Sequence, residues 1–316
     1  MSRLAELLDD DRPDPAPCGS PPWRRAARAT ALSALAACES LRPRPRKASV
    51  QFLLLHHVRV DEEAAFRRLL RRLSANYRLI DYDAAARRVT TGEGDHPTVD
   101  ARPQLAVSFD DGLACNRRAA AVLEEFGVRG AFFVCPPVHA EADRGVLDRF
   151  CRQRLRHAPA EFLRWDGVEA LHAAGHTIGG HTLSHVDLGD VSHGRAVDEI
   201  NGCREDLLAR LGTADHFAWP YGSLRHVTDA AVSAVFDAGF ATCASGVRGA
   251  HAVDRSAEPP SDAAVVLRRQ SIEAGWPVSH VQTFLRLAAR RPLQSDASSV
   301  RRPESPESGD HHRDAA

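Results

Sequence analysis

Short apolar runs alternate with amphipathic helical patterns along most of this chain, and this alternation limits its possible folds more than any other feature. Buried strands are expected at 50–58, 104–109, 130–135, 176–181, 216–220, 240–245 and 265–272. Helices are expected between and after them, at 61–76, 81–92, 115–127, 165–175, 192–211, 227–239 and 277–290. Alternation at this spacing predicts a parallel sheet or a barrel.

The sequence contains neither of the glycine-rich patterns that cradle phosphates, G-x-G-x-x-G and G-x-x-x-x-G-K-[ST]. A nucleotide-binding sheet is therefore disfavoured, and we expect an α/β fold built as a (β/α) barrel. In such barrels the chemistry collects at the carboxyl ends of the strands. Asp110, His181 and Tyr221 each lie at or just beyond the end of an expected strand, so they are the first candidates for a site.

The chain divides into three expected parts. Residues 1–47 are rich in Pro, Arg and Ala and are expected to form an N-terminal arm outside the main fold, weakly structured or an amphipathic helix. One catalytic domain is expected over 48–291. Residues 292–316 are polar and rich in Pro and Ser, which predicts a disordered tail.

Composition disfavours several classes of function. Hydrophobic residues make up 43% of the chain and charged residues 26%, and the formal net charge is −1, which is ordinary for a globular protein. This balance indicates neither nucleic acid nor an anionic membrane surface as a partner. No window approaches the ~20 apolar residues of a membrane span.

The cysteines bear on the compartment. They are odd in number, 7, and form no C-x-x-C pair, so neither a disulfide framework nor a zinc knuckle is indicated. A reducing compartment, and hence a cytoplasmic location, is expected. The alternative is a lipoprotein of the cell envelope, because "LAAC", which ends at Cys38, resembles a bacterial lipoprotein cleavage box.

The stretch "AVSFDDGLA" (106–114) carries two carboxylates directly after an apolar strand. Asp110 and Asp111 would repel each other unless a cation or a proton settles their charges. A turn or a helix cap would also explain such a pair taken alone.

A second stretch, "GGHTLSHVDL", carries His181 and His185 four residues apart. On a helical turn their imidazoles would project from one face. With Asp111 as a third ligand they would hold a divalent metal, and Asp110 would be left as a base. We expect one Zn²⁺, with Co²⁺, Ni²⁺ or Fe²⁺ as alternatives. An isolated H-x-x-x-H is also common as a surface or core pair.

Three stretches together are far more specific: "VSFDDG", "WDGVEALHAAGHTIGGHTLSH" and "FAWPYG". With them the chain resembles, from about residue 50 to 290, the polysaccharide deacetylase family, the NodB-homology domain of carbohydrate esterase family 4. The resemblance implies a distorted (β/α) barrel and a hydrolase that removes N-acetyl, sometimes O-acetyl, groups through metal-activated water. The implied partner is an N-acetylated glycan or saccharide intermediate; no oligomeric state is indicated.

Carried over by position, the resemblance gives each motif residue a role. Asp110 would be the general base. The metal ligands would be Asp111, His181 and His185. The backbone N–H of Tyr221 would help to hold the oxyanion.

The chain departs from the family pattern at two places. Ala218 stands where the family often has an arginine that positions the base; Arg269 is the candidate substitute, and a solvated strand residue is the alternative. The Leu-x-His motif that supplies the general acid is not evident. His57 is therefore a candidate acid or substrate contact, or a strand-end histidine bonded to the backbone.

Three functions stay open on this basis. The first is an active deacetylase of an N-acetylated glycan or a lipid-linked saccharide. The second is a non-catalytic carbohydrate-binding relative, and the third is a hydrolase of other non-peptide C–N bonds. Few side chains offer platforms for sugar rings: Trp165, Trp219 and Tyr221 are the candidates.

Overall fold

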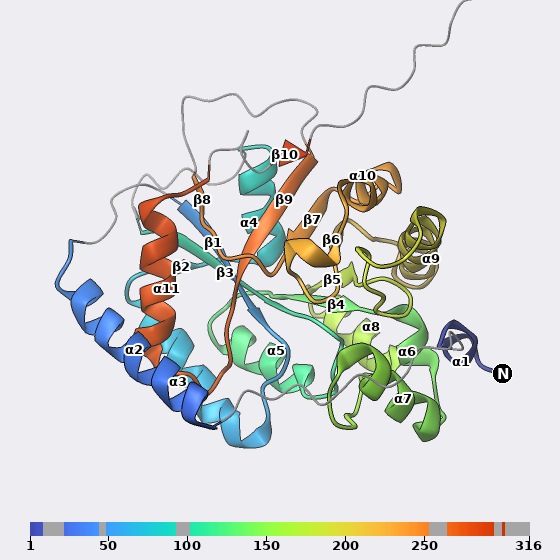
Figure 1. Cartoon of the computed structure of the whole chain (residues 1–316), viewed down its shortest axis with the longest axis horizontal. Helices are drawn as coiled ribbons and strands as arrows, with labels where there is room; N and C mark the ends of the chain where they lie inside the picture. The colour runs from blue at the N-terminus through green and yellow to red at the C-terminus, as the bar shows by residue number, and fades with distance from the viewer. Residues whose placement is uncertain (9–21, 44–48, 93–101, 253–263, 294–298, 301–316) are drawn as a thin grey trace, which may run out of the picture.

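The computed structural model describes residues 1–8, 22–43, 49–92, 102–252, 264–293 and 299–300. Parallel strands form a closed ring of seven (Figure 1). In order around the ring they are β1 (Ser49–Leu55), β3 (Gln104–Phe109), β4 (Ala131–Val134), β5 (Thr177–Gly180), β6 (His216–Ala218), β7 (Thr242–Ser245) and β9 (Ala264–Ser271). The ring closes because β9 pairs in parallel with both β7 and β1. The predicted distorted (β/α) barrel is confirmed.

Helices surround the ring, and each long one falls within a stretch with helical patterning in the sequence. They are α3 (Glu63–Ser74), α4 (Tyr82–Thr90), α5 (Asn116–Glu125), α8 (Trp165–Ala173), α9 (His193–Leu211), α10 (Asp229–Asp237) and α11 (Val278–Arg290). Three short strands add to the sheet: β2 (Arg78–Leu79), β8 (His251–Ala252) and β10 (Ser299–Val300). The 3₁₀ turns are η1 (Val60–Glu62) and η3 (Leu224–His226).

Alternation along the strands separates two layers of the core. On β1, Phe52 belongs to a cluster with Ala106 and Phe133, whereas its neighbour Leu53 belongs to the larger cluster that includes Leu69 of α3. All seven residues of β1 are buried. This is expected of a barrel strand, whose side chains point alternately into the ring and toward the helices.

The segment between β4 and α8 holds elements that the sequence pattern does not predict. They are α6 (Pro136–Ala140), α7 (Arg144–Phe150) and a π-helical turn (Cys151–Leu155). Arg156 ends the π-helical turn in the left-handed conformation, with φ of 53°. These elements are too short to show an amphipathic period, so only tertiary contacts reveal them.

Two helices of the predicted N-terminal arm contact the domain. The first, α1 (Arg3–Leu7), buries Leu4 in a cluster with Phe150, and its Arg3 pairs with Asp206 at 2.6 Å. The second, α2 (Pro22–Ser40), packs against α11 and leaves Cys38 exposed. Most of the predicted tail, 301–316, lies outside the described residues, and the domain boundaries stay a prediction. No described helix is both long and apolar enough to cross a membrane.

Acid should destabilise the fold through His251 on β8. This side chain is 2% exposed, and its Nε2 accepts the backbone N–H of Arg268 at 2.9 Å. Burial, aided by the charge of Arg268, lowers the pKa of His251 to about 4. The unfolded chain binds this proton at about pH 6.5, so the stabilising contribution is complete above that pH and is lost as the pH falls toward 4. We expect a loss of about 2 kcal/mol between pH 7 and 5 from this residue.

Urea unfolding of the wild type and of His251→Gln at pH 7 and pH 5 measures this contribution. Glutamine keeps an acceptor for the Arg268 N–H but takes up no proton. The acid-induced loss of stability should therefore be smaller in the variant, and equal losses in both proteins would contradict the assignment.

Candidate active site

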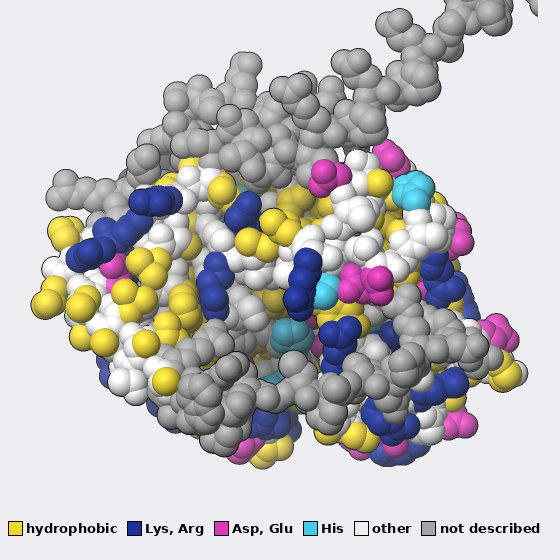
Figure 2. Space-filling model, viewed as in Figure 1, with side chains coloured by type: hydrophobic (Ala, Val, Ile, Leu, Met, Phe, Trp, Pro, Cys, Tyr) yellow, Lys and Arg dark blue, Asp and Glu magenta, His cyan; other side chains and the backbone are white. Residues whose placement is uncertain are grey.

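A cavity of about 470 Å³ opens at the carboxyl ends of the strands. Its lining includes every candidate catalytic or metal-ligating residue from the sequence except Arg269: His57, Asp110, Asp111, His181, His185 and Tyr221. Histidine side chains are visible in a hollow near the middle of the face drawn in Figure 2. The barrel therefore brings together residues that are as far apart in the sequence as His57 and Tyr221.

Asp111, His181 and His185 converge on one point of this cavity. Asp111 Oδ1 lies 3.5 Å from His181 Nε2 and 3.3 Å from His185 Nε2. One donor atom from each residue lies within 4.8 Å of the others. The Nδ1 of His181 is 2.7 Å from the carbonyl of Ala218, which accepts its proton and leaves the Nε2 lone pair facing Asp111.

The two histidines meet, but not on a helical turn as expected. Residues 182–184 form a turn in which Thr182 has φ of 63°, and His185 has φ of 54°. Glu199 of α9 holds this turn by accepting the Ser184 N–H at 2.8 Å and the Ser184 hydroxyl at 2.6 Å. The i, i+4 spacing predicted that the two imidazoles would face one point because of a helical turn. They do face one point, but residues in the left-handed conformation, not a helix, bring them together.

The residues present fit a divalent metal. Asp111 Oδ1 is buried and has no hydrogen-bond donor among the described residues. A buried carboxylate oxygen without a donor, facing two imidazole nitrogens, is a donor set suited to Zn²⁺ and related ions.

Asp110 is held by a buried arginine. Arg269 Nη1 and Nη2 donate to its two carboxylate oxygens at 2.7 and 2.8 Å, and Arg269 Nε donates to the carbonyl of Ser245 at 2.9 Å. Arg269 is fully buried, so the alternative of a solvated strand residue is wrong. The guanidinium reaches Asp110 from β9, whereas the family pattern places an arginine at the position of Ala218.

Replacing Arg269 with alanine should lower both stability and turnover. The variant leaves Asp110 buried without its cation, which is expected to lower the free energy of unfolding by about 3–5 kcal/mol. It should also lower kcat while metal content stays the same. Arg268→Ala, the half-buried neighbour on β9, is the control. Unchanged stability and kcat in Arg269→Ala would contradict a positioning role for Arg269.

Tyr221 packs against one of the metal-ligand candidates. Its φ is 61°, and its ring packs edge-on against His185 with the centroids 4.8 Å apart. The phenol donates to the carbonyl of Arg154 in the π-helical turn at 2.7 Å, and Arg156 lies over the ring at 5.1 Å. Within the described residues the Tyr221 N–H has no acceptor, so this donor is available to a ligand.

His57 extends from the end of β1 into the same cavity and has a carboxylate partner. Its Nδ1 lies 2.9 Å from Oε2 of Glu62 in η1. The alternative of a strand-end histidine bonded to the backbone therefore does not describe this residue. Sequence reasoning did not find Glu62; the short spacing between a histidine and an acidic turn in "HHVRVDEE" is the signal that could have shown it.

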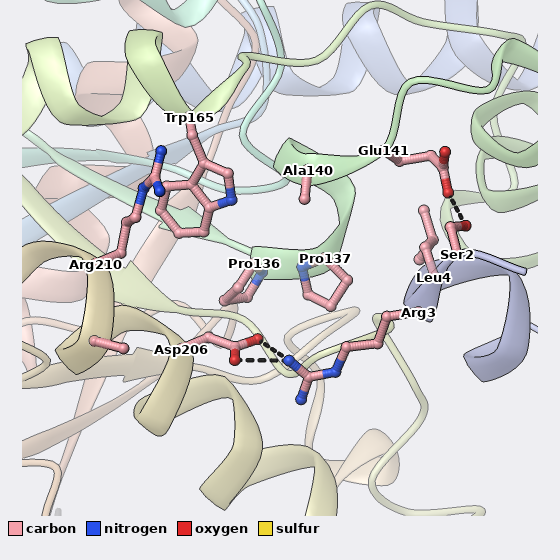
Figure 3. A pocket seen from close by; sticks show the side chains of 11 residues that line it. Ser2, Arg3, Leu4, Pro136, Pro137, Ala140, Glu141, Trp165, Asp206 and Arg210 are labelled. Atoms are coloured by element: carbon pink, nitrogen blue, oxygen red, sulfur yellow. Dashed lines mark hydrogen bonds and ion pairs between the residues drawn. The ribbon is translucent and has the colours of Figure 1, made fainter.

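Two of the three candidate sugar-stacking residues lie elsewhere. Trp219 is 1% exposed and cannot offer a ring to a ligand. Trp165 lines a separate cavity of about 380 Å³ beside α1, where Arg210 lies over its ring at 5.4 Å (Figure 3). Of the three candidates, Tyr221 alone lines the cavity that holds Asp110 and Asp111.

Known proteins are similar to this chain in sequence motifs and in fold. Residues 99–242 match the family model described as polysaccharide deacetylase. No curated protein matches the chain. Among solved structures the chain is similar to IcaB from Ammonifex degensii, with 20% identity and a TM-score of 0.56 over 76% of this chain and 97% of that one.

Two further solved structures have the same fold. One is the Streptococcus pyogenes deacetylase PplD in complex with acetate, with 14% identity and a TM-score of 0.54 over 75% of this chain and 99% of that one. The other is the putative polysaccharide deacetylase BA0330 from Bacillus anthracis, with 17% identity and a TM-score of 0.55 over 75% and 69%. The family match contains Asp110 and the metal-ligand candidates, but neither His57 nor Arg269.

Proposed function

We propose that this chain is a member of the polysaccharide deacetylase family, hydrolases that act on carbon–nitrogen bonds other than peptide bonds, and that it removes N-acetyl groups from a glycan. One observation carries the proposal. The cavity holds a metal-type donor set, Asp111 with His181 and His185, directly beside a carboxylate that Arg269 holds in place. Metal-assisted amide hydrolysis uses a Lewis acid and a base at one carbonyl.

The side chains divide the reaction between them. A divalent ion held by Asp111, His181 and His185 would polarise the acetyl carbonyl and acidify water. Asp110 takes the proton of the attacking water, and Arg269 fixes the direction of its carboxylate. The Tyr221 N–H donates to the oxygen on which negative charge develops.

The leaving nitrogen also needs a proton before it can depart as an amine. We assign that donation to His57, which lines the same cavity as Asp110 and carries a carboxylate partner. This assignment answers the lack of a Leu-x-His motif and favours an active enzyme over a non-catalytic carbohydrate-binding relative. An O-acetyl group would need less help from an acid, because an alkoxide leaves more readily than an amide anion.

Metal content and acetate release, measured on the same preparation, test the proposal. Purified protein is assayed for bound divalent metal and then incubated with N-acetylglucosamine oligomers while free acetate is followed. One metal per chain with acetate release is the expected result. Bound metal without release from N-acetylated or O-acetylated glycans would favour the non-catalytic relative, and release from small acyl amides alone would favour the third function. No metal after reconstitution would overturn the site.

A further inference from the structure

We propose that Glu62 is the positioning residue for the general acid: its carboxylate accepts a hydrogen bond from His57 Nδ1 and so orients the imidazole that gives its proton to the leaving amine. The inference rests on the proposed function and adds to it a residue outside the family-matched segment. It follows from the contacts of η1 with the end of β1.

The contact between the two side chains is direct and largely shielded from solvent. Glu62 Oε2 lies 2.9 Å from His57 Nδ1, and the side chains of Glu62 and His57 are 10% and 25% exposed. The Nδ1–H donates to the carboxylate, so the other ring nitrogen, Nε2, is left for the cavity that His57 lines. A carboxylate on one imidazole nitrogen fixes the tautomer and the orientation of the ring.

Glu62 also has a structural role that must be separated from this one. Its Oε2 accepts the backbone N–H of Arg59 at 3.0 Å, which caps η1, and its Oε1 pairs with Arg59 Nη2 at 3.0 Å. A cap needs only an acceptor oxygen, which an uncharged amide supplies equally well. The negative charge of Glu62 matters to His57 and not to the cap.

The other histidines of the cavity are less suited to be the acid. His181 and His185 face Asp111 as metal-ligand candidates. His56 and His157 also line the cavity, but both are exposed, and the Nδ1 of His157 bonds to the carbonyl of Ala158 at 2.6 Å. Among the described histidines that line the cavity, His57 is the one that pairs with a carboxylate other than Asp111.

The proposed step balances in protons and electrons. When the C–N bond of the tetrahedral intermediate breaks, its electron pair leaves with the nitrogen, and the carbonyl reforms. The Nε2–H proton of His57 moves to that nitrogen, so the product is a neutral amine. His57 becomes neutral and keeps its Nδ1–H on Glu62, ready to regain a proton from water.

An experiment with two leaving groups isolates this step. N-acetylglucosamine oligomers have an amine leaving group that needs a proton, whereas 4-nitrophenyl acetate releases a stable phenolate that does not. Glu62→Gln keeps the cap but removes the charge, and we expect its kcat on the oligomers to fall about tenfold, because a charge-assisted hydrogen bond to His57 is replaced by a weaker neutral one. KM for the oligomers, kcat for the ester and metal content should not change.

Four further variants make the result decisive. His57→Gln should lower kcat on the oligomers about 10²-fold, and adding Glu62→Gln to it should lower kcat no further. Glu62→Asp keeps the charge and should retain more oligomer activity than Glu62→Gln. Glu63→Gln is the matched control, because Glu63 pairs with Arg67 and Arg118 and not with His57.

The outcomes separate the inference from the function beneath it. Equal losses on the oligomers and the ester, or no loss on either, would overturn the role of Glu62 while leaving the deacetylase in place. Additive losses in the double variant would overturn it too. A wild type that holds metal but releases acetate from neither substrate would instead overturn the proposed function, and the acid with it.

Discussion

Zinc should no longer bind when Asp111 is replaced by alanine, and acetate release should disappear with it. The variant removes the only carboxylate of the donor set and leaves two imidazoles 4.9 Å apart, centroid to centroid, around a buried space. Two neutral ligands cannot match the charge of a divalent ion there, and we expect affinity to fall by at least about 10²-fold. Titration of apoprotein with Zn²⁺, followed by calorimetry, measures the change.

His181→Ala should give the same phenotype as Asp111→Ala, because either change breaks the same donor set. Asp237→Ala at the exposed end of α10 serves as the control and should bind metal as the wild type does. If Asp111→Ala retained wild-type affinity while His181→Ala lost it, the carboxylate ligand would have to be sought elsewhere in the cavity.

Asp110→Asn should also lose turnover but, unlike Asp111→Ala, should retain the metal. Asparagine has the shape of aspartate but cannot take a proton from water, and removal of a general base lowers kcat about 10²–10⁴-fold. Arg269 keeps one acceptor oxygen at this position, so the side chain stays in place more readily than alanine would. Metal content, KM and kcat on N-acetylglucosamine oligomers are the quantities to compare.

Stability must be followed in the same variant, because Arg269 loses its counter-charge there. A lower Tm together with normal metal content would agree with the paired geometry of the wild type. Full kcat in Asp110→Asn would show that another group accepts the proton, and it would exclude Asp110 as the base.

The sequence was sufficient to predict the barrel and the identity of the metal-ligand candidates, because both depend on local patterns. Parallel strands bring their carboxyl ends to one side, so Asp111 after β3 and His181 after β5 had to approach each other. The local geometry was harder to foresee. The turn that joins His181 to His185 is held by a hydrogen bond that Ser184 donates to Glu199. Glu199 lies too far along the chain to belong to the same short motif.

Residues that act through contacts across the fold were the least predictable. From the sequence, Arg269 could be either the arginine that positions Asp110 or a solvated strand residue. Its distance from Asp110 along the chain does not show that closure of the ring brings the two together. Glu62 was missed because its cap on η1 explains an acidic residue there without reference to His57. The π-helical turn that receives the Tyr221 phenol has no sequence period from which to predict it.

The strand that closes the ring also carries the cation for the proposed base. Arg269 lies opposite Phe52 where β9 meets β1, and β9 is the last of the ring strands along the chain. Until β9 inserts, Asp110 has no guanidinium beside it, however completely the metal ligands have assembled. A chain that lacked β9 would therefore lack both the strand that closes the ring and the guanidinium that holds the proposed base.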